Sequence, residues 1–224
     1  MTSTYDLRDP ALPAPGDLVK FPAAPYALAS SYCGAYLAEL ARAAATIDPA
    51  QVDRAAGVLL EAYTAGATVF SCGNGGSAAI ANHLQCDHSK GVRTGTDLLP
   101  KVVSLSTNVE VLTAVANDIG YEEIFAHQLQ SQSRPGDVLV AISSSGRSQN
   151  VVRALRWAGE HGLRTIALTG FDGGDARAAA EVAVHVDCTN YGIVEDLHQG
   201  VMHALAQYVR QSRMSPALVE LTTF

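Results

Sequence analysis

The feature that most constrains the fold is an alternation, from about residue 67 to residue 212, of short apolar runs with segments of helical periodicity. The runs are nearly continuous Val, Leu, Ile and Ala, which is typical of strands buried on both faces. Strands separated by helices pair in parallel, with the helices covering the sheet. The sequence therefore predicts an α/β fold, in which a central parallel sheet is sandwiched by helices in three layers (αβα).

The expected elements follow in order along the chain. Two helices, over 26–45 and 49–65, precede the first strand, and Asp48 followed by Pro49 is a favourable start for the second of them. Strands are expected over 68–72, 102–106, 137–142, 164–169 and 182–186, and helices over 77–89, 108–116, 121–132, 148–161, 174–180 and 192–212.

The two ends of the chain differ from its middle. Residues 1–25 hold five of the nine prolines and show little periodicity, which predicts an N-terminal arm. Residues 26–214 are expected to form one domain, and 215–224 a C-terminal tail. A chain of 224 residues with 48% apolar side chains can build one large α/β domain without needing a second.

Charge and cysteine content narrow the class of partner. A net charge of −7 argues against general affinity for nucleic acid or anionic membranes, so local groups must hold any phosphate ligand. The start of the chain lacks a signal-peptide pattern and no apolar run approaches 18 residues, so we expect a cytoplasmic protein. The four cysteines form no C-x-x-C pair and are expected to be buried free thiols, namely Cys33, Cys72, Cys86 and Cys188.

Two turns between a strand and a helix look suited to bind an anion. They are Gly-Asn-Gly-Gly-Ser at 73–77 and Ser-Ser-Ser-Gly-Arg-Ser at 143–148. Free backbone N–H groups at a helix N-terminus favour phosphate, and ligands of parallel sheets bind at the carboxyl ends of the strands. The glycine turn alone also fits a plain change of chain direction, and it matches neither common nucleotide-binding motif. The serine turn carries more hydroxyls than capping needs.

A second group of residues is ionisable. His83 and Asp87 are four residues apart on one expected helix, and Glu195 and His203 are eight apart on the last one, so each pair shares a helix face. Imidazole and carboxylate groups suit Zn²⁺ or a similar cation, and a carboxylate can act as a base. Each pair taken alone also fits a solvated helix face. Two further histidines are alternative ligands, His88 and His198.

Taken together, the motifs resemble the sugar isomerase (SIS) family. The resemblance rests on 73–77 followed by His83, on 113–125, on 135–139 and on 142–148, and it spans about residues 30–212. More narrowly, the chain is similar to the phosphoheptose isomerases, which convert sedoheptulose 7-phosphate to D-glycero-D-manno-heptose 7-phosphate. The order and spacing of these motifs are more specific than any single loop.

The resemblance implies roles for individual residues. It implies one Zn²⁺ per subunit, with His83, Asp87, Glu195 and His203 as ligands, and it makes Asp87, Glu195 and His203 the catalytic residues. His203 would shuttle a proton, and the base is either Asp87 or Glu195. The implied substrate- and phosphate-binding residues are Asn74, Gly75, Gly76, Ser77, Asn117, Asp118, Ser143, Ser144, Ser145 and Ser148.

Three positions depart from the family pattern. Asp87 replaces a glutamate and Glu195 a glutamine, and both replacements keep an oxygen donor. Gly91 stands where the family has an arginine, for which Lys90 and Arg93 are possible substitutes. A different ketose phosphate therefore remains an alternative substrate.

The resemblance also implies a homotetramer in which the opening helices pack between subunits. The apolar opening helix supports this, since few charges solvate it. A different class of function is a non-catalytic regulator similar to the bacterial replication-initiator-associating factor. The presence of both His83 and His203 favours the enzyme, because a binding module needs neither.

Overall fold

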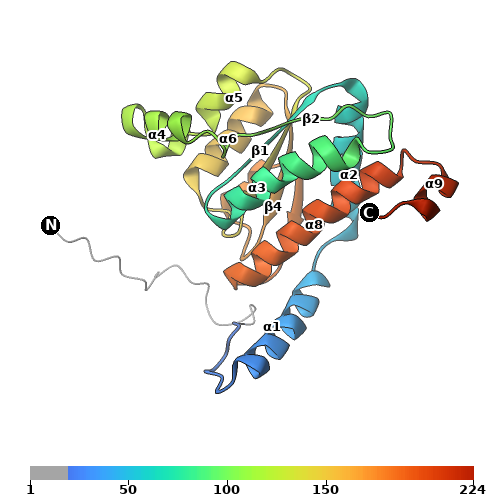
Figure 1. Ribbon diagram of the computed structural model, residues 1–224. Coiled ribbons are helices and arrows are strands. Elements are labelled where there is room, and N and C mark those ends of the chain that lie inside the picture. Colours follow the sequence, from blue (N-terminus) through green and yellow to red (C-terminus); the bar gives the residue numbers. More distant parts are fainter. Residues whose placement is uncertain (1–19) are drawn as a thin grey trace.

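The computed structural model describes residues 20–224, and most of the arm expected over 1–25 lies outside them. In this part of the chain, one sheet of five parallel strands has the order β2-β1-β3-β4-β5, with helices on both faces (Figure 1). The strands are β1 (Thr68–Gly73), β2 (Lys101–Ser104), β3 (Val138–Ser143), β4 (Arg164–Thr169) and β5 (Val182–His185). The predicted three-layer α/β class is confirmed.

Helices precede the first strand, separate the strands and follow the last one. They are α1 (Ala29–Ala44), α2 (Pro49–Ala65), α3 (Gly76–Cys86), α4 (Val109–Asp118), α5 (Ala126–Gln132), α6 (Gln149–Glu160), α7 (Gly174–Ala179), α8 (Tyr191–Gln211) and α9 (Pro216–Leu221). A π-helix follows α3 at Asp87–Val92, and a short 3₁₀ helix precedes α5 at Tyr121–Glu123. The segment expected as a plain C-terminal tail thus contains a helix, α9.

Two apolar clusters explain why the strands are apolar throughout. In β3, Val140 and Ile142 belong to the cluster shared with α2, α3 and α8. The intervening Leu139 and Ala141 belong to the cluster shared with α4 to α7. Because successive side chains of a strand point to opposite faces, both faces of β3 are buried, as the continuous apolar run predicts.

Three predicted boundaries differ from the structure. The helix expected over 77–89 ends at Cys86 and continues as the π-helix, a feature that often marks functional sites. The helix expected over 121–132 is divided into the 3₁₀ turn and α5. Strand β2 ends at Ser104 and not at residue 106, because the Ser106 backbone N–H donates to the Ser104 hydroxyl at 3.2 Å, which bends the chain.

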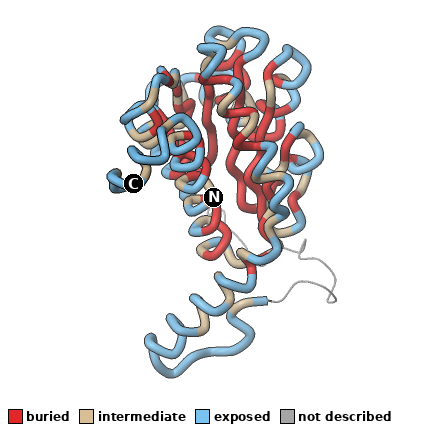
Figure 2. Tube along the Cα trace, turned by 90° about the vertical axis from the view of Figure 1, so that its right-hand side faces the viewer, coloured by how far each residue is buried: buried red, intermediate tan, exposed pale blue. Residues whose placement is uncertain are grey.

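Helix α1 projects from the body of the domain, and much of it is exposed (Figures 1 and 2). Leu28 and Leu37 at this projection are 63% and 57% exposed. Near its middle, α1 is attached to α8 through the Tyr36 hydroxyl, which donates to Asp196 at 2.6 Å. Among the helices of residues 20–224, none has the length and apolar character needed to cross a membrane.

The cysteine prediction is half right. Cys72 and Cys188 are buried free thiols, as expected, but Cys33 and Cys86 are exposed. Cys33 lies on the projecting α1, and Cys86 ends α3 on the exposed side of that helix. Helical spacing placed both residues on helices without showing which face the domain would cover.

Candidate active site

The two predicted turns meet at one cavity. Strands β1 and β3 are neighbours in the sheet, so the turns after their carboxyl ends lie side by side. They line a cavity of about 160 Å³ together with the first turns of α8. The polar residues in its wall are Asn74, Ser77, Ser143, Ser144, Ser145, Ser148, Tyr191 and Glu195.

Two of the four serine hydroxyls in the 143–148 turn are available to a ligand. Ser144 Oγ is buried and has no hydrogen-bond partner among the described residues. Ser148 is the N-cap residue of α6, yet its side chain caps no backbone N–H group. By contrast, Ser143 Oγ and Ser145 Oγ accept hydrogen bonds from the loop itself, at 3.2 and 3.3 Å. The free Ser148 hydroxyl therefore lies at the N-terminus of a 12-residue helix, where an anion is favoured.

Gly146 fixes the shape of the serine turn. Its φ is +67°, a left-handed conformation that favours glycine. A Cβ added there would lie only 1.9 Å from the Gly173 carbonyl oxygen, so no other residue fits without moving backbone. The next side chain, Arg147, forms an ion pair with Asp172, which keeps its charge outside the cavity.

Asn74 is held by other side chains. Its amide exchanges two hydrogen bonds of 2.9 Å with the amide of Asn150, and the Tyr121 hydroxyl donates to its oxygen at 3.0 Å. These bonds tie the glycine turn to α6. Asn150 belongs to none of the sequence motifs. Only its paired hydrogen bonds with Asn74 show that it supports the glycine turn.

Asn117 and Asp118 lie apart from the cavity. Both are exposed at the end of α4, where the Asn117 amide donates to the Asp118 carboxylate at 2.7 Å. Neither residue lines the cavity formed by the two turns. The structure of the single chain thus does not bring this predicted pair together with the serines.

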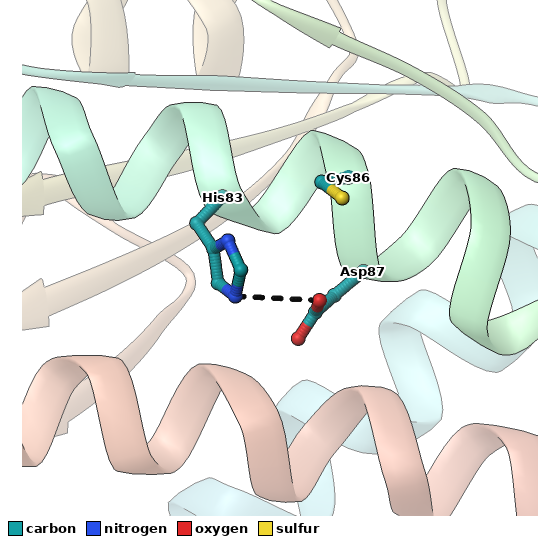
Figure 3. Close-up of side chains that lie close together, drawn as sticks. All are labelled: His83, Cys86 and Asp87. Carbon is teal, nitrogen blue, oxygen red and sulfur yellow. Dashed lines mark ion pairs between the residues drawn. The ribbon is translucent and has the colours of Figure 1, made fainter.

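Asp87 joins the two predicted histidines. His83 Nε2 is 3.4 Å from Asp87 Oδ1, and His203 Nδ1 is 2.6 Å from Asp87 Oδ2. Figure 3 shows His83 and Asp87 pointing into the space between α3 and α8. The Asp87 side chain is 26% exposed and those of the histidines 41–45%, so the group is open to a ligand. Gln199, which sequence analysis missed, approaches the other His203 nitrogen at 2.8 Å.

Glu195 lies in the first turns of α8, beside the N-terminal end of α3. A Cβ added to Gly76 would be 2.2 Å from Glu195 Oε2, so a side chain at the first position of α3 would displace the Glu195 carboxylate. Burial raises the pKa of the Glu195 carboxyl, and the neighbouring Asp196 adds to the shift. Glu195 therefore faces the serine-lined cavity, about two turns of α8 before His203.

The donor atoms near Asp87 fit a divalent metal. His83, Cys86 and Asp87 offer ligand atoms that all lie within 4.8 Å of one another, a set of nitrogen, sulfur and oxygen donors that suits Zn²⁺. His203 touches this group through Asp87, and Glu195 is not part of it. The alternative ligands His88 and His198 are fully buried. His88 bonds the Tyr63 hydroxyl at 2.6 Å, so neither alternative serves this site.

Known proteins share this fold and these motifs. The family described as SIS domain matches residues 31–170. A phosphoheptose isomerase of Rhodospirillum rubrum is 40% identical over 164 residues, which cover 73% of this chain and 87% of the relative. One of Mycobacterium tuberculosis is 38% identical over 162 residues, covering 70% and 80%.

Solved structures agree with the sequence relatives. A phosphoheptose isomerase of Neisseria gonorrhoeae is 33% identical with a TM-score of 0.74, covering 81% of this chain and 98% of that one. One of Francisella tularensis is 27% identical with a TM-score of 0.75, covering 82% and 99%. The fold and the serine-lined cavity thus define a SIS-domain protein. Within that class, the chain belongs to the phosphoheptose isomerase family of aldose–ketose isomerases.

Proposed function

We propose that this protein converts sedoheptulose 7-phosphate to D-glycero-D-manno-heptose 7-phosphate. The reaction moves a proton between C1 and C2 through an enediolate, so it needs a base, an acid and stabilisation of an oxyanion. The observation that carries the proposal is the 2.6 Å contact between Asp87 and His203, which lies in the same α3–α8 region as the anion-binding cavity.

The cavity would hold the phosphate. The hydroxyls of Ser144 and Ser148 donate to phosphate oxygens, together with free N–H groups at the start of α6. The remaining serines and the asparagine pair shape the loop. Because these contacts are equal in the ground state and the transition state, they lower KM more than they raise kcat.

Asp87 is the stronger candidate for the base. Among residues 20–224, only this carboxylate contacts His203, which can accept the proton and return it, whereas Glu195 lies beside the phosphate cavity. Glu195 is in the wall of the phosphate cavity, where its carboxylate oxygens can accept hydrogen bonds from sugar hydroxyls.

A bound Zn²⁺ would polarise the substrate carbonyl. His83, Asp87 and His203 would hold it, with Cys86 within reach and Glu195 as the further ligand that the resemblance implies. The chain's own residues orient the sugar and move the proton.

The oligomeric state and the location of the protein are part of the proposal. The exposed apolar side chains of α1 support a homotetramer in which this helix is covered by other subunits. In such an assembly Asn117 and Asp118 would serve a site at a subunit boundary. We expect the enzyme to act in the cytoplasm.

The test is an NMR assay of the purified protein with sedoheptulose 7-phosphate, with Zn²⁺ added or with chelator. A new aldose anomeric signal, lost with chelator and in Asp87→Asn, supports the proposal. The control is Asp97→Asn, which removes an exposed carboxylate paired with Arg213. If the folded, metal-loaded protein does not convert this substrate but converts another ketose phosphate, that compound is the substrate. If it converts no member of a panel of sugar phosphates, the protein is better explained as a regulator.

A further inference from the structure

A second hollow opens beside the Asp87–His203 pair. It has a volume of about 420 Å³, and its wall includes Lys90, Gln207, Arg210 and Phe224 as well as Asp87 and His203. Along α3 and the π-helix, the order is Ser77, Asp87, Lys90. Along α8, it is Glu195, His203, Arg210. The Asp87–His203 pair thus separates the serine-lined cavity at one end from this hollow at the other.

The hollow carries positive charge in an acidic protein. Lys90 and Arg210 are the basic side chains in its wall, and within residues 20–224 neither forms an ion pair with an acidic residue. The carboxylate in the wall, Asp87, is already shared between His83 and His203. Two cations of the hollow are therefore left for a ligand.

Arg210 is held in place from two sides. Its Nε donates to the Thr94 carbonyl oxygen at 2.9 Å, and its guanidinium carbon lies 4.8 Å from the centre of the Phe224 ring. These contacts fix the plane of the guanidinium and leave its terminal N–H groups for other partners. The C-terminal segment thus forms part of the wall.

The π-helix places Lys90 on the same hollow. Lys90 follows Asp87 by three residues, and both face α8 at the point where the π-helix packs on that helix. Gly91 adds no bulk, and a Cβ there would meet nothing within 4 Å. The space beside Asp87 is therefore open, and its two cations come from different elements.

We propose that Lys90 and Arg210 bind the oxygens at the isomerising end of the sugar phosphate and stabilise the enediolate. This inference rests on the proposed function. When Asp87 removes the C1 proton, the C1–H electron pair forms the C1–C2 double bond and the carbonyl oxygen on C2 becomes negative. Asp87 then returns its proton to C2, where the C1–C2 double-bond pair forms the new C–H bond. The C1 hydroxyl gives its proton to His203 as its O–H electron pair forms the aldehyde C=O bond, and His203 passes a proton to the C2 oxygen. Fixed cations beside that oxygen favour the charged intermediate over the neutral substrate.

The test compares Arg210→Gln and Lys90→Gln with Arg156→Gln. Arg156 is an exposed cation on α6 that pairs with Asp175 and does not line the hollow. We expect each of the first two changes to lower kcat by roughly 10²-fold, as for loss of one oxyanion donor. The Kd for inorganic phosphate should stay unchanged, because phosphate binds in the serine-lined cavity. Arg156→Gln should behave as wild type, and Arg210→Lys should recover part of the rate because it keeps the charge.

A second measurement separates this inference from the proposed function. A phosphorylated hydroxamate carries charged planar oxygens like those of an enediolate, and its Kd, measured by calorimetry, should rise in Arg210→Gln and Lys90→Gln. If wild type turns over but both variants keep its kcat and its hydroxamate affinity, the inference is wrong and the proposed function stands. A wild-type protein that neither turns over nor binds the hydroxamate overturns both. Should Arg210→Gln fail to fold, Lys90→Gln and Arg210→Lys decide the matter.

Discussion

His203 Nδ1 lies 2.6 Å from Asp87 Oδ2, a contact between residues 116 positions apart in the chain. With a proton on Nδ1, the imidazole donates to the carboxylate, and Nε2 is left to accept from the Gln199 amide at 2.8 Å. In this arrangement each ring nitrogen of His203 has a hydrogen-bond partner. The contact also orients a carboxylate oxygen toward the space between α3 and α8.

Replacing Asp87 by asparagine should reduce turnover far more than binding. The amide keeps nearly the same shape but cannot accept a proton, so we expect kcat to fall by about 10²- to 10⁴-fold, the range for loss of a general base. Stopped assays on sedoheptulose 7-phosphate would measure kcat and KM. A variant with wild-type kcat would contradict the role of Asp87, and Asp87→Glu should keep part of the rate because it keeps the carboxylate.

Replacing Ser148 by alanine should weaken phosphate binding with little effect on kcat. Its hydroxyl caps nothing in the free protein, so its removal leaves the helix intact and takes one donor from the anion. Loss of a hydrogen bond to a charged group corresponds to roughly 10- to 100-fold in affinity. Calorimetry with inorganic phosphate measures this, and Ser131→Ala on α5, whose hydroxyl bonds the Gln128 carbonyl oxygen, is the matched control. An unchanged Kd in Ser148→Ala would place the phosphate elsewhere.

The sequence predicted the sheet, and it predicted two neighbouring turns that together line a cavity, because both depend on local patterns. Continuous apolar runs separated by helices require a buried parallel sheet, and surplus hydroxyls at a helix start indicate a ligand. The partners of those groups could not be predicted. Asn150 matters because its amide meets that of Asn74 across 76 positions, and no local pattern specifies such a pair.

The contacts among the predicted ionisable residues could not be predicted from the sequence either. Spacing placed His83 and Asp87 on one face and Glu195 and His203 on another, but only the packing of α3 against α8 determines which of them touch. The structure joins Asp87 to His203 and leaves Glu195 at the cavity beside Gly76. The switch from α-helix to π-helix after Cys86, which carries Lys90 to the second hollow, has no clear sequence signal.

Gly76 and Glu195 should be energetically coupled. A Cβ at residue 76 collides with the Glu195 carboxylate, so Gly76→Ala should displace that side chain and impair substrate binding. In Glu195→Ala the space is free, and adding Gly76→Ala should then cost little. A double-mutant cycle on the free energy of unfolding and on KM measures the coupling, which is expected to be about 0.5–3 kcal/mol for residues in contact. Additive effects would show that the two residues are independent.

A matched glycine tests whether that effect is specific. Gly57 lies within α2, and a Cβ there would meet nothing within 4 Å. Alanine has the higher helix propensity, so Gly57→Ala should raise the free energy of unfolding by about 0.5–1 kcal/mol and leave KM unchanged. Denaturant titration measures the gain, and a loss of stability would indicate crowding that the structure does not show.

His198 should make the protein less stable in acid. The side chain is fully buried, and neither ring nitrogen has a hydrogen-bond partner among the described residues. Burial lowers its pKa to about 4, against a smaller opposing effect of the Thr169 backbone. Between pH 6.5 and pH 4 the unfolded chain therefore binds more protons than the folded one. The free energy of unfolding is highest above pH 6.5 and falls as the pH drops, by up to about 1.4 kcal/mol per pH unit for one such group.

His198→Leu should flatten this dependence. Leucine removes the titrating group and two unpaired polar atoms, so we expect unchanged or higher stability at pH 7 and a shallower slope between pH 6.5 and pH 4. Part of the slope should remain, because burial also lowers the pKa of His88 to about 4. Urea titrations across this pH range measure the slope, and His127→Leu, which changes an exposed side chain on α5, should keep that of the wild type. A slope in His198→Leu equal to that of the wild type would mean that His198 is protonated in the folded protein or is reached by water.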